Sequence, residues 1–157
     1  MKKAIGGKNI YGYPIGILML ETQFPRIPGD IGNATTWDFP VLYKIIKKAT
    51  PDLVVRKGAP GLLEPFIRGA QELEKEGVRA ITTNCGFLAL FQKEMASAVN
   101  IPVFTSSLMQ VPLAYMMIKP SQKVGIITVH SKSLTQKHLS CVGADKIPHI
   151  IYGTEGE

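Results

Sequence analysis

The chain has 157 residues, of which 45% are hydrophobic and 19% charged, and its formal net charge is +6 at pH 7. This length and composition predict a globular chain with a sizeable core, and they exclude a low-complexity or repeat protein. Lysine and arginine are spread along the sequence, so the charge indicates solubility and mild attraction for anions, not a nucleic-acid surface. No apolar run approaches the roughly 18 residues that a membrane span needs, so we expect no membrane partner.

The two cysteines, Cys85 and Cys141, lie far apart and fall in different predicted elements. This spacing gives no disulfide framework and no metal motif such as Cys-x-x-Cys, so we expect no metal site. Free cysteines indicate a reducing compartment, and residues 6–9 interrupt the start of the chain before the apolar core of a signal peptide develops. The expected location is therefore cytoplasmic.

The first half of the chain predicts strands and helices in alternation. After a loosely held lead-in over residues 1–13, the apolar run Ile15–Leu20 is typical of a central strand buried on both faces, and a long proline- and glycine-rich loop follows it. The spacing of apolar residues then predicts a helix from about residue 38 or 40 to residue 49. A second strand is expected at residues 53–55, and a second helix at residues 62–76.

The second half continues the pattern. We expect strands and helices in the following order: a strand at 78–81, a helix to about 98, a strand at 102–104, a crossing helix at 108–118, a strand at 123–129, a helix to about 141 and a strand at 147–152. The order predicts an α/β fold with a parallel, doubly wound sheet and helices on both faces. The first domain is expected at residues 1–105, and the crossing helix with an incomplete second α/β domain at 106–157.

Cys85 is expected at the point where a buried strand ends and a helix begins. The unpaired N–H groups and the positive end of a helix dipole would lower the pKa of its thiol below the usual value of about 8.5. Thr83 and Asn84 beside it are donors that suit a carboxylate or an enolate oxygen. Ligands of open α/β sheets bind outside the carboxyl ends of the strands. The alternative is that Cys85 only packs as a small buried hydrophobe.

Three segments carry a resemblance to a known family. They are the strand and loop from Ile-Gly-Ile-Leu-Met-Leu-Glu-Thr to Pro-Gly-Asp-Ile-Gly-Asn, the turn Thr-Thr-Asn-Cys-Gly-Phe, and Ile-Pro-Val-Phe-Thr-Ser-Ser. Together they resemble the aspartate/glutamate/hydantoin racemase superfamily, over the chain from about Ile15. The resemblance implies two similar α/β domains with the active site between them, and an amino-acid racemase that needs neither pyridoxal phosphate nor a metal.

The resemblance also implies roles for individual residues. Cys85 would be the first-domain catalytic cysteine, with Thr83 and Asn84 holding the substrate carboxylate or orienting the thiolate. Further residues of the same pocket would come from the loop after the first strand and from the turn after the strand at 102–104: Glu21, Thr22, Asn33, Thr105 and Ser106. Each of these also has a simpler interpretation as a turn former or a helix cap.

The sequence departs from the family in one respect. The second catalytic cysteine follows a strand of the second domain that this sequence does not contain, and Cys141, near a helix end, fits packing better than catalysis. The resulting expectation is a racemase-type enzyme for an amino acid or a related small carboxylate, truncated before its second cysteine. The alternatives are an isomerase or decarboxylase acting on a dicarboxylate, and a non-catalytic anion-binding module. Self-association through apolar surface of the unfinished second sheet is also expected to be possible.

Overall fold

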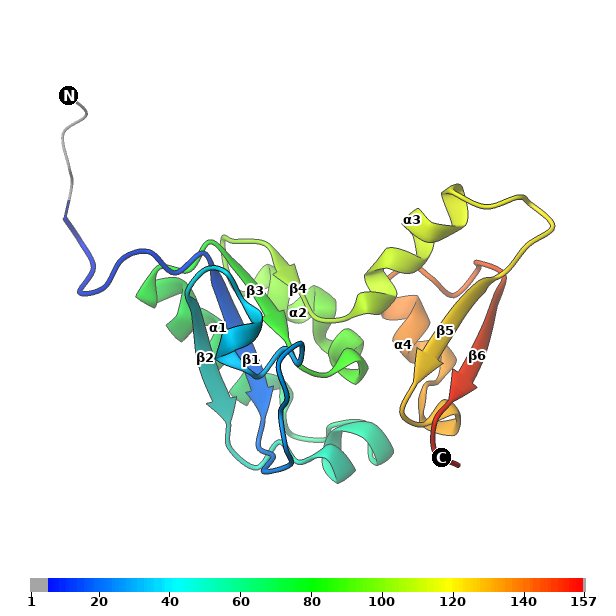
Figure 1. Cartoon of the computed structure of the whole chain (residues 1–157), viewed down its shortest axis with the longest axis horizontal. Helices are drawn as coiled ribbons and strands as arrows, with labels where there is room; N and C mark the ends of the chain where they lie inside the picture. The colour runs from blue at the N-terminus through cyan, green and yellow to red at the C-terminus, as the bar shows by residue number, and fades with distance from the viewer. Residues whose placement is uncertain (1–5, 157) are drawn as a thin grey trace.

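The computed structural model describes residues 6–156, so the first five residues of the expected lead-in lie outside the described part. Its strands form two parallel sheets, a large sheet in the order β2-β1-β3-β4 and a small sheet of β5 and β6. Figure 1 shows the two sheets in separate parts of the molecule, connected by the segment that carries α3. The strands are β1 (Ile15–Leu20), β2 (Val41–Ile46), β3 (Ala80–Thr83), β4 (Val103–Phe104), β5 (Val124–Thr128) and β6 (His149–Gly153). The predicted α/β class with parallel strands is confirmed.

Helices and short helical turns connect the strands. The α-helices are α1 (Leu63–Glu76), α2 (Gln92–Ser97), α3 (Val111–Met116) and α4 (Gln136–Cys141). The 3-10 turns are η1 (Ala34–Thr36), η3 (Gly86–Phe91), η4 (Ser107–Gln110) and η5 (Ser131–Ser133), and η2 (Asp52–Arg56) is a π-helical turn. Gly77 ends α1 in the left-handed conformation, at φ 100°.

Two assignments in the first half of the sequence are wrong, in opposite senses. The segment expected as a helix forms β2, which pairs with β1 over its whole length, and the strand expected at residues 53–55 lies in the helical turn η2. Apolar residues at 41, 42, 45 and 46 satisfy helical spacing, but the segment is rich in β-branched and aromatic side chains, which suit a strand beside β1. Pro51 precedes η2 with φ −54°, which starts a helical turn easily.

The large sheet carries α1 on one face. Gly16 lets the helix approach closely, because a Cβ on this glycine would lie 2.9 Å from a methyl carbon of Leu73. The core on this face contains fully buried side chains from the sheet and the helices: Leu18, Phe66, Leu73, Ile81 and Met95. The loop at residues 21–40 covers the other face of β1 and β2, where the Tyr43 hydroxyl donates to the Ile31 carbonyl oxygen at 3.0 Å.

The two parts of the molecule are in contact where α4 packs against η3. The ring of His138 in α4 lies edge-to-face against the ring of Phe87 in η3, with 5.3 Å between centroids and 85° between planes. The predicted boundary at residues 105 and 106 falls between β4 and η4; it stays a prediction of how the chain divides, and so does self-association. No helix in the described part of the chain is both long and apolar enough to cross a membrane.

Candidate active site

Cys85 lies directly beyond β3 and is the N-cap residue of η3, with extended backbone angles of φ −140° and ψ 113°. The hydroxyl of Thr83 fixes this turn, because it donates to the Thr105 carbonyl oxygen at 2.7 Å and accepts from the Cys85 N–H at 3.4 Å. A Cβ on Gly86 would lie 3.2 Å from the Ser106 hydroxyl oxygen. The turns after β3 and β4 therefore lie side by side, with the Cys85 thiol beside them.

The pKa of the Cys85 thiol differs from the expectation. Burial raises this pKa above its ordinary value, and the hydrogen bond from the Phe87 backbone N–H lowers it by less. The element that begins at Gly86 is a 3-10 turn that leads directly into α2, and the single backbone hydrogen bond that it provides does not offset the desolvation of the thiol. Near neutral pH the chain itself favours the protonated thiol, and a cation beside Cys85 would favour the thiolate.

Two cavities meet at Cys85. The first cavity, of about 360 Å³, extends toward the ends of β5 and β6, where Thr128 and Thr154 line it. The second cavity, of about 570 Å³, extends along the turn after β4 toward Ile31 of the loop after β1. The wall shared by both cavities consists of Asn84, Cys85, Gly86, Ser106 and Ser107.

The shared wall offers hydrogen-bond donors. The side-chain oxygen of Asn84 accepts from the Leu20 N–H at 2.8 Å, so its NH₂ group is left as a donor at the wall. The Ser106 hydroxyl oxygen accepts from the Leu108 N–H at 3.1 Å, which leaves the hydroxyl proton to donate elsewhere. These groups suit a carboxylate whose negative charge grows during a reaction.

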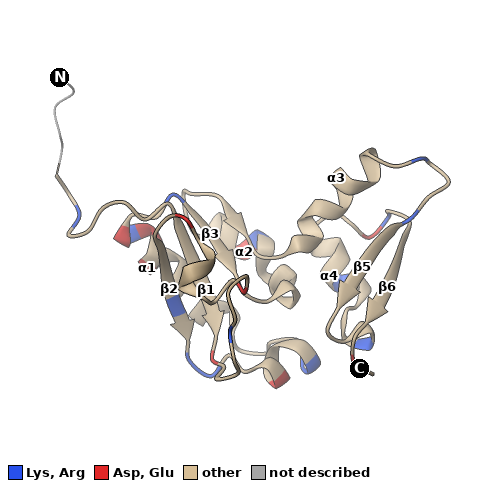
Figure 2. Cartoon of the chain, in the orientation of Figure 1, with Lys and Arg blue, Asp and Glu red and all other residues tan. Residues whose placement is uncertain are grey.

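Among the residues that the structure describes, no charged side chain lines either cavity. Figure 2 shows lysine, arginine, aspartate and glutamate distributed over both parts of the molecule instead. The described residues also contain no cluster of three or more His, Cys, Asp or Glu that could hold a metal ion. A ligand whose charges cancel fits such a lining better than a dianion does, because a buried unpaired charge is costly.

The structure brings together five of the predicted site residues. Cys85, Asn84 and Ser106 line both cavities, and Thr83 and Thr105 line the second. Thr105 is 1% exposed, and its hydroxyl donates to the Gln92 side-chain oxygen at 2.7 Å. Thr83 and Thr105 therefore have their hydroxyl groups engaged within the protein, where they support the wall.

The other three predicted residues lie outside the lining of both cavities. The Glu21 carboxylate accepts from the Lys48 N–H at 2.6 Å, and the Thr22 hydroxyl accepts from the Arg26 guanidinium at 2.8 Å. Asn33 caps η1 by accepting from the Thr35 N–H at 2.9 Å. In the structure these three residues hold turn and cap positions, through bonds to Arg26 and Thr35 nearby and to Lys48, 27 positions away.

Sequence reasoning missed several residues that line the cavities. The missed residues are Ile31, Phe104, Ser107, Met109, Gln110, Thr128 and Thr154. Thr128 ends a strand that the sequence predicts, so the rule that identified Cys85, a polar residue at the carboxyl end of a strand, could have found it. Ile31 and Phe104 lie in segments that carry the family resemblance, but no local pattern indicates that their side chains line a cavity, because this depends on how the loop and β4 pack.

No family model matches the chain. It is 32% identical over 132 residues to a dimethylsulfoniopropionate lyase from Durusdinium sp. clade D, which covers 83% of this chain and 44% of the relative. It is 28% identical over 121 residues to dimethylsulfoniopropionate lyase 3 from Emiliania huxleyi (strain CCMP1516), which covers 76% of this chain and 32% of the relative. The chain thus spans less than half the length of these curated relatives.

Solved structures with a similar fold include arylmalonate decarboxylase. A variant of that enzyme in a sulfate-associated form matches with a TM-score of 0.56 and 14% identity, over 90% of this chain and 62% of the other. The unliganded enzyme matches with a TM-score of 0.50 and 14% identity, over 90% of this chain and 64% of the other. At this identity the comparison shows the fold alone: the chain has the α/β fold of arylmalonate decarboxylase.

These findings correct the expected function. The amino-acid racemase prediction is wrong, because the sequence relatives are named dimethylsulfoniopropionate lyases. The alternative of a related isomerase or decarboxylase agrees better with these findings than the racemase does. The motif around Cys85 predicts a thiol at the end of a strand, but it carries no information on the rest of the cavity lining.

Proposed function

We propose that this chain carries the site of a carbon–sulfur lyase that acts on dimethylsulfoniopropionate, with Cys85 as the base. The relatives' names support the substrate, and one observation in this chain supports the chemistry. Cys85 lies in the wall between two cavities without charged linings, next to the amide and hydroxyl donors of Asn84 and Ser106. Such a wall suits proton removal from the carbon beside a carboxylate.

The proposed reaction is an elimination. Dimethylsulfoniopropionate has a carboxylate at one end and a dimethylsulfonium group on the second carbon from it. The Cys85 thiolate takes a proton from the carbon next to the carboxylate, and the electron pair of that C–H bond becomes the new carbon–carbon double bond. The carbon–sulfur bond breaks with its electrons on sulfur, which releases neutral dimethyl sulfide and leaves acrylate. The thiol then returns its proton to water.

The charges of this substrate fit the site. The carboxylate gains negative charge as the proton leaves, and Asn84 and Ser106 would donate hydrogen bonds to it. The sulfonium cation, held in the same space, would lower the thiol pKa that burial raises, so the substrate itself would favour the thiolate. A thiolate with a raised pKa is also a stronger base for a weakly acidic C–H bond.

An elimination of this kind also matches the number of cysteines at the site. Racemisation needs a second group to return a proton on the opposite face, whereas this elimination needs one base. Cys85 lines both cavities, and Cys141, in α4, is not among the residues described as lining either. The zwitterionic substrate carries no net charge, in agreement with a lining that provides neither lysine nor arginine for a dianion.

The test is release of dimethyl sulfide from dimethylsulfoniopropionate, measured in the headspace by gas chromatography. We expect release by the unchanged protein and loss of at least about 100-fold with Cys85→Ala, because the base is removed. Cys141→Ala is the matched control and should keep the activity. Release by Cys85→Ala at the unchanged rate would disprove the role of Cys85, and no release by the unchanged protein would disprove the proposed function.

A further inference from the structure

We infer that Phe104, together with Met109, binds the dimethylsulfonium group in the second cavity and so selects a cationic substrate. This inference rests on the proposed function and deepens it, since it assigns the part of the site that recognises the leaving group. It depends on the position of Phe104, on the packing of the other aromatic residue at the site, and on the uncharged lining.

Phe104 has an unusual position for a large apolar residue. In β4, Val103 is 5% exposed and points into the core, whereas Phe104, on the opposite face, is 53% exposed. The Thr82 hydroxyl donates to the Phe104 carbonyl oxygen at 2.9 Å, so the backbone at this point is held. The side chain lines the second cavity with Met109 and Leu113, at the carboxyl end of the large sheet. Its ring is thus available to a ligand that also reaches Cys85.

The first cavity also contains an aromatic residue, but that ring is engaged. Phe87 is 4% exposed and packs edge-to-face against the ring of His138 at 5.3 Å between centroids. Its side chain belongs to the contact between the two parts of the molecule. Of the aromatic residues that line the cavities, Phe104 therefore offers the accessible ring, which places the cationic end of the ligand in the second cavity.

A sulfonium ion is suited to this environment. Its positive charge extends over two methyl groups, so it loses less hydration than an ammonium ion on entering an apolar space, and an aromatic face attracts it through the ring quadrupole. The polarisable thioether of Met109 adds a soft contact. No described carboxylate lines the cavity, so a strongly hydrated cation would find no partner there. The lining selects a methylated onium group over a lysine-like amine.

The arrangement also orients the reaction. With the sulfonium in the second cavity and the carboxylate on the Asn84 and Ser106 donors, the two carbons between them lie along the shared wall that contains Cys85. The carbon next to the carboxylate then faces the thiol, and the carbon–sulfur bond points away from it toward Phe104. Proton and leaving group are thereby held on different sides of the substrate.

The experiment compares two carboxylates of the same shape, one with the sulfonium group and one with an uncharged CH group in its place. Affinities for dimethylsulfoniopropionate and for 4-methylpentanoate, in which a CH group replaces the sulfonium sulfur, are measured by titration calorimetry in a Cys85→Ser background that prevents turnover. Phe104→Leu should weaken the binding of dimethylsulfoniopropionate by about 2- to 5-fold, as expected for a cation–π contact with a half-exposed ring, and leave that of 4-methylpentanoate essentially unchanged. Phe104→Tyr should retain the preference for the cation.

Leu113→Ala is the matched control, because Leu113 lines the same cavity and is 51% exposed. It should weaken the binding of both ligands equally. Equal losses for both ligands with Phe104→Leu would overturn the inference, since the ring would then supply only apolar surface. If binding is selective for the sulfonium ligand but the protein with Cys85 intact releases no dimethyl sulfide, the proposed lyase function is overturned and the cation site stands. If the unchanged protein releases dimethyl sulfide and Phe104→Leu has the same KM for dimethylsulfoniopropionate, only the cation site is overturned.

Discussion

The Leu20 N–H donates to the Asn84 side-chain oxygen at 2.8 Å, across 64 positions of sequence. This bond joins the end of β1 to the residue before Cys85, and it fixes which end of the amide faces the cavities. The central strand of the large sheet therefore sets the orientation of a donor group at the candidate site.

Replacing Asn84 tests the importance of this donor. In Asn84→Asp, a carboxylate oxygen can still accept from the Leu20 N–H, but the NH₂ donor is replaced by a negative charge that repels a substrate carboxylate. We expect kcat/KM for dimethyl sulfide release to fall by about 100-fold or more, with little change in thermal stability. Asn84→Ala, which also removes the bond to Leu20, should lose both activity and stability. An Asn84→Asp variant with full activity would show that the amide donor has no part in the reaction.

The pH dependence of alkylation tests the state of the Cys85 thiol. Because burial raises its pKa, alkylation by iodoacetamide should be slow near pH 7 and should accelerate only above the pH at which an ordinary free cysteine reacts. The measurement is made on Cys141→Ser, so that Cys85 alone is labelled, and followed by intact mass. Rapid labelling below pH 7 would contradict the raised pKa.

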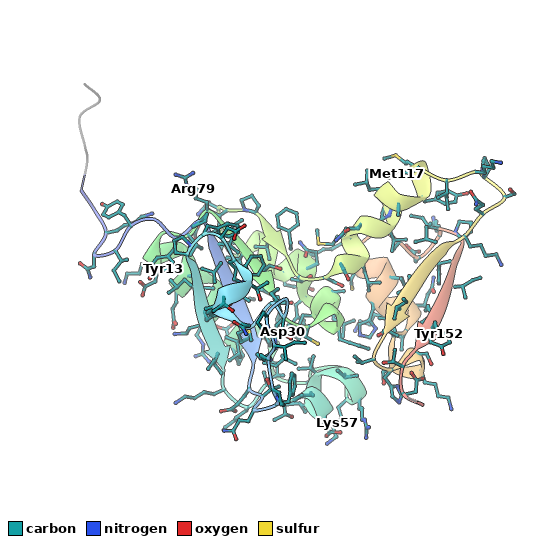
Figure 3. All side chains as sticks on the ribbon, in the orientation of Figure 1. Tyr13, Asp30, Lys57, Arg79, Met117 and Tyr152 are labelled. Atoms are coloured by element: carbon teal, nitrogen blue, oxygen red, sulfur yellow. The ribbon has the colours of Figure 1, made fainter. Side chains whose placement is uncertain are left out.

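Replacing Asp30, which is labelled in Figure 3, tests how its charge stabilises the loop that reaches the second cavity through Ile31. Burial acts to raise the pKa of Asp30, but hydrogen bonds from the Arg26 guanidinium and the Gly32 N–H outweigh it, so the pKa lies below the ordinary value. The charged carboxylate therefore contributes stability above the pKa of the unfolded chain, and this is lost as pH falls through the folded pKa. Asp30→Asn should lower the stability at pH 7 by about 1 kcal/mol, a figure kept small by partial exposure.

This change corresponds to a fall of roughly 2–4 °C in Tm for a chain of this size. The difference between Asp30→Asn and the unchanged protein should shrink as pH is lowered toward 3, and scanning calorimetry at several pH values measures it. Lys57 and Asp52 form an exposed ion pair, so Asp52→Asn is a control that should change Tm little. A difference for Asp30→Asn that stays constant with pH would contradict the assignment.

Protonation of His138 predicts a second pH effect on stability, in the same direction as that of Asp30. Burial lowers the pKa of His138 and nearby Lys137 adds to the lowering, while a backbone hydrogen bond with Thr135 acts against both. A depressed histidine pKa gives stability that is complete above the pKa of the unfolded chain and is lost as pH falls toward the folded pKa. His138 Nε2 is buried without a hydrogen-bond partner, so protonation places an unpaired charge against Phe87.

We therefore expect Tm to fall between pH 7 and pH 5, and His138→Gln to remove part of that fall. His149→Gln is the matched control, since this histidine is only partly buried in β6. If the fall in Tm is the same with and without His138, the contact between α4 and η3 does not depend on a neutral imidazole.

The turn around Cys85 could be predicted because its signals are local. A short apolar strand, a polar turn and an apolar helical segment occur in sequence over residues 78–91, and the structure has β3 and η3 there. The segment at residues 41–46 could not be assigned in this way, because its apolar residues satisfy both helical and strand spacing. Pairing with β1 decides between the two, and pairing depends on residues far away in the sequence.

The sequence by itself determined the α/β class and the position of Cys85 at the end of a buried strand, since both depend on neighbouring residues. Only the tertiary structure decided which more distant side chains join Asn84 and Ser106 beside Cys85, because Ile31, Phe104 and Thr128 come from separate elements. It also decided the direction of the Cys85 pKa shift. Burial is a property of the packed molecule, and the desolvation that it causes outweighs the local effect of a short helical turn.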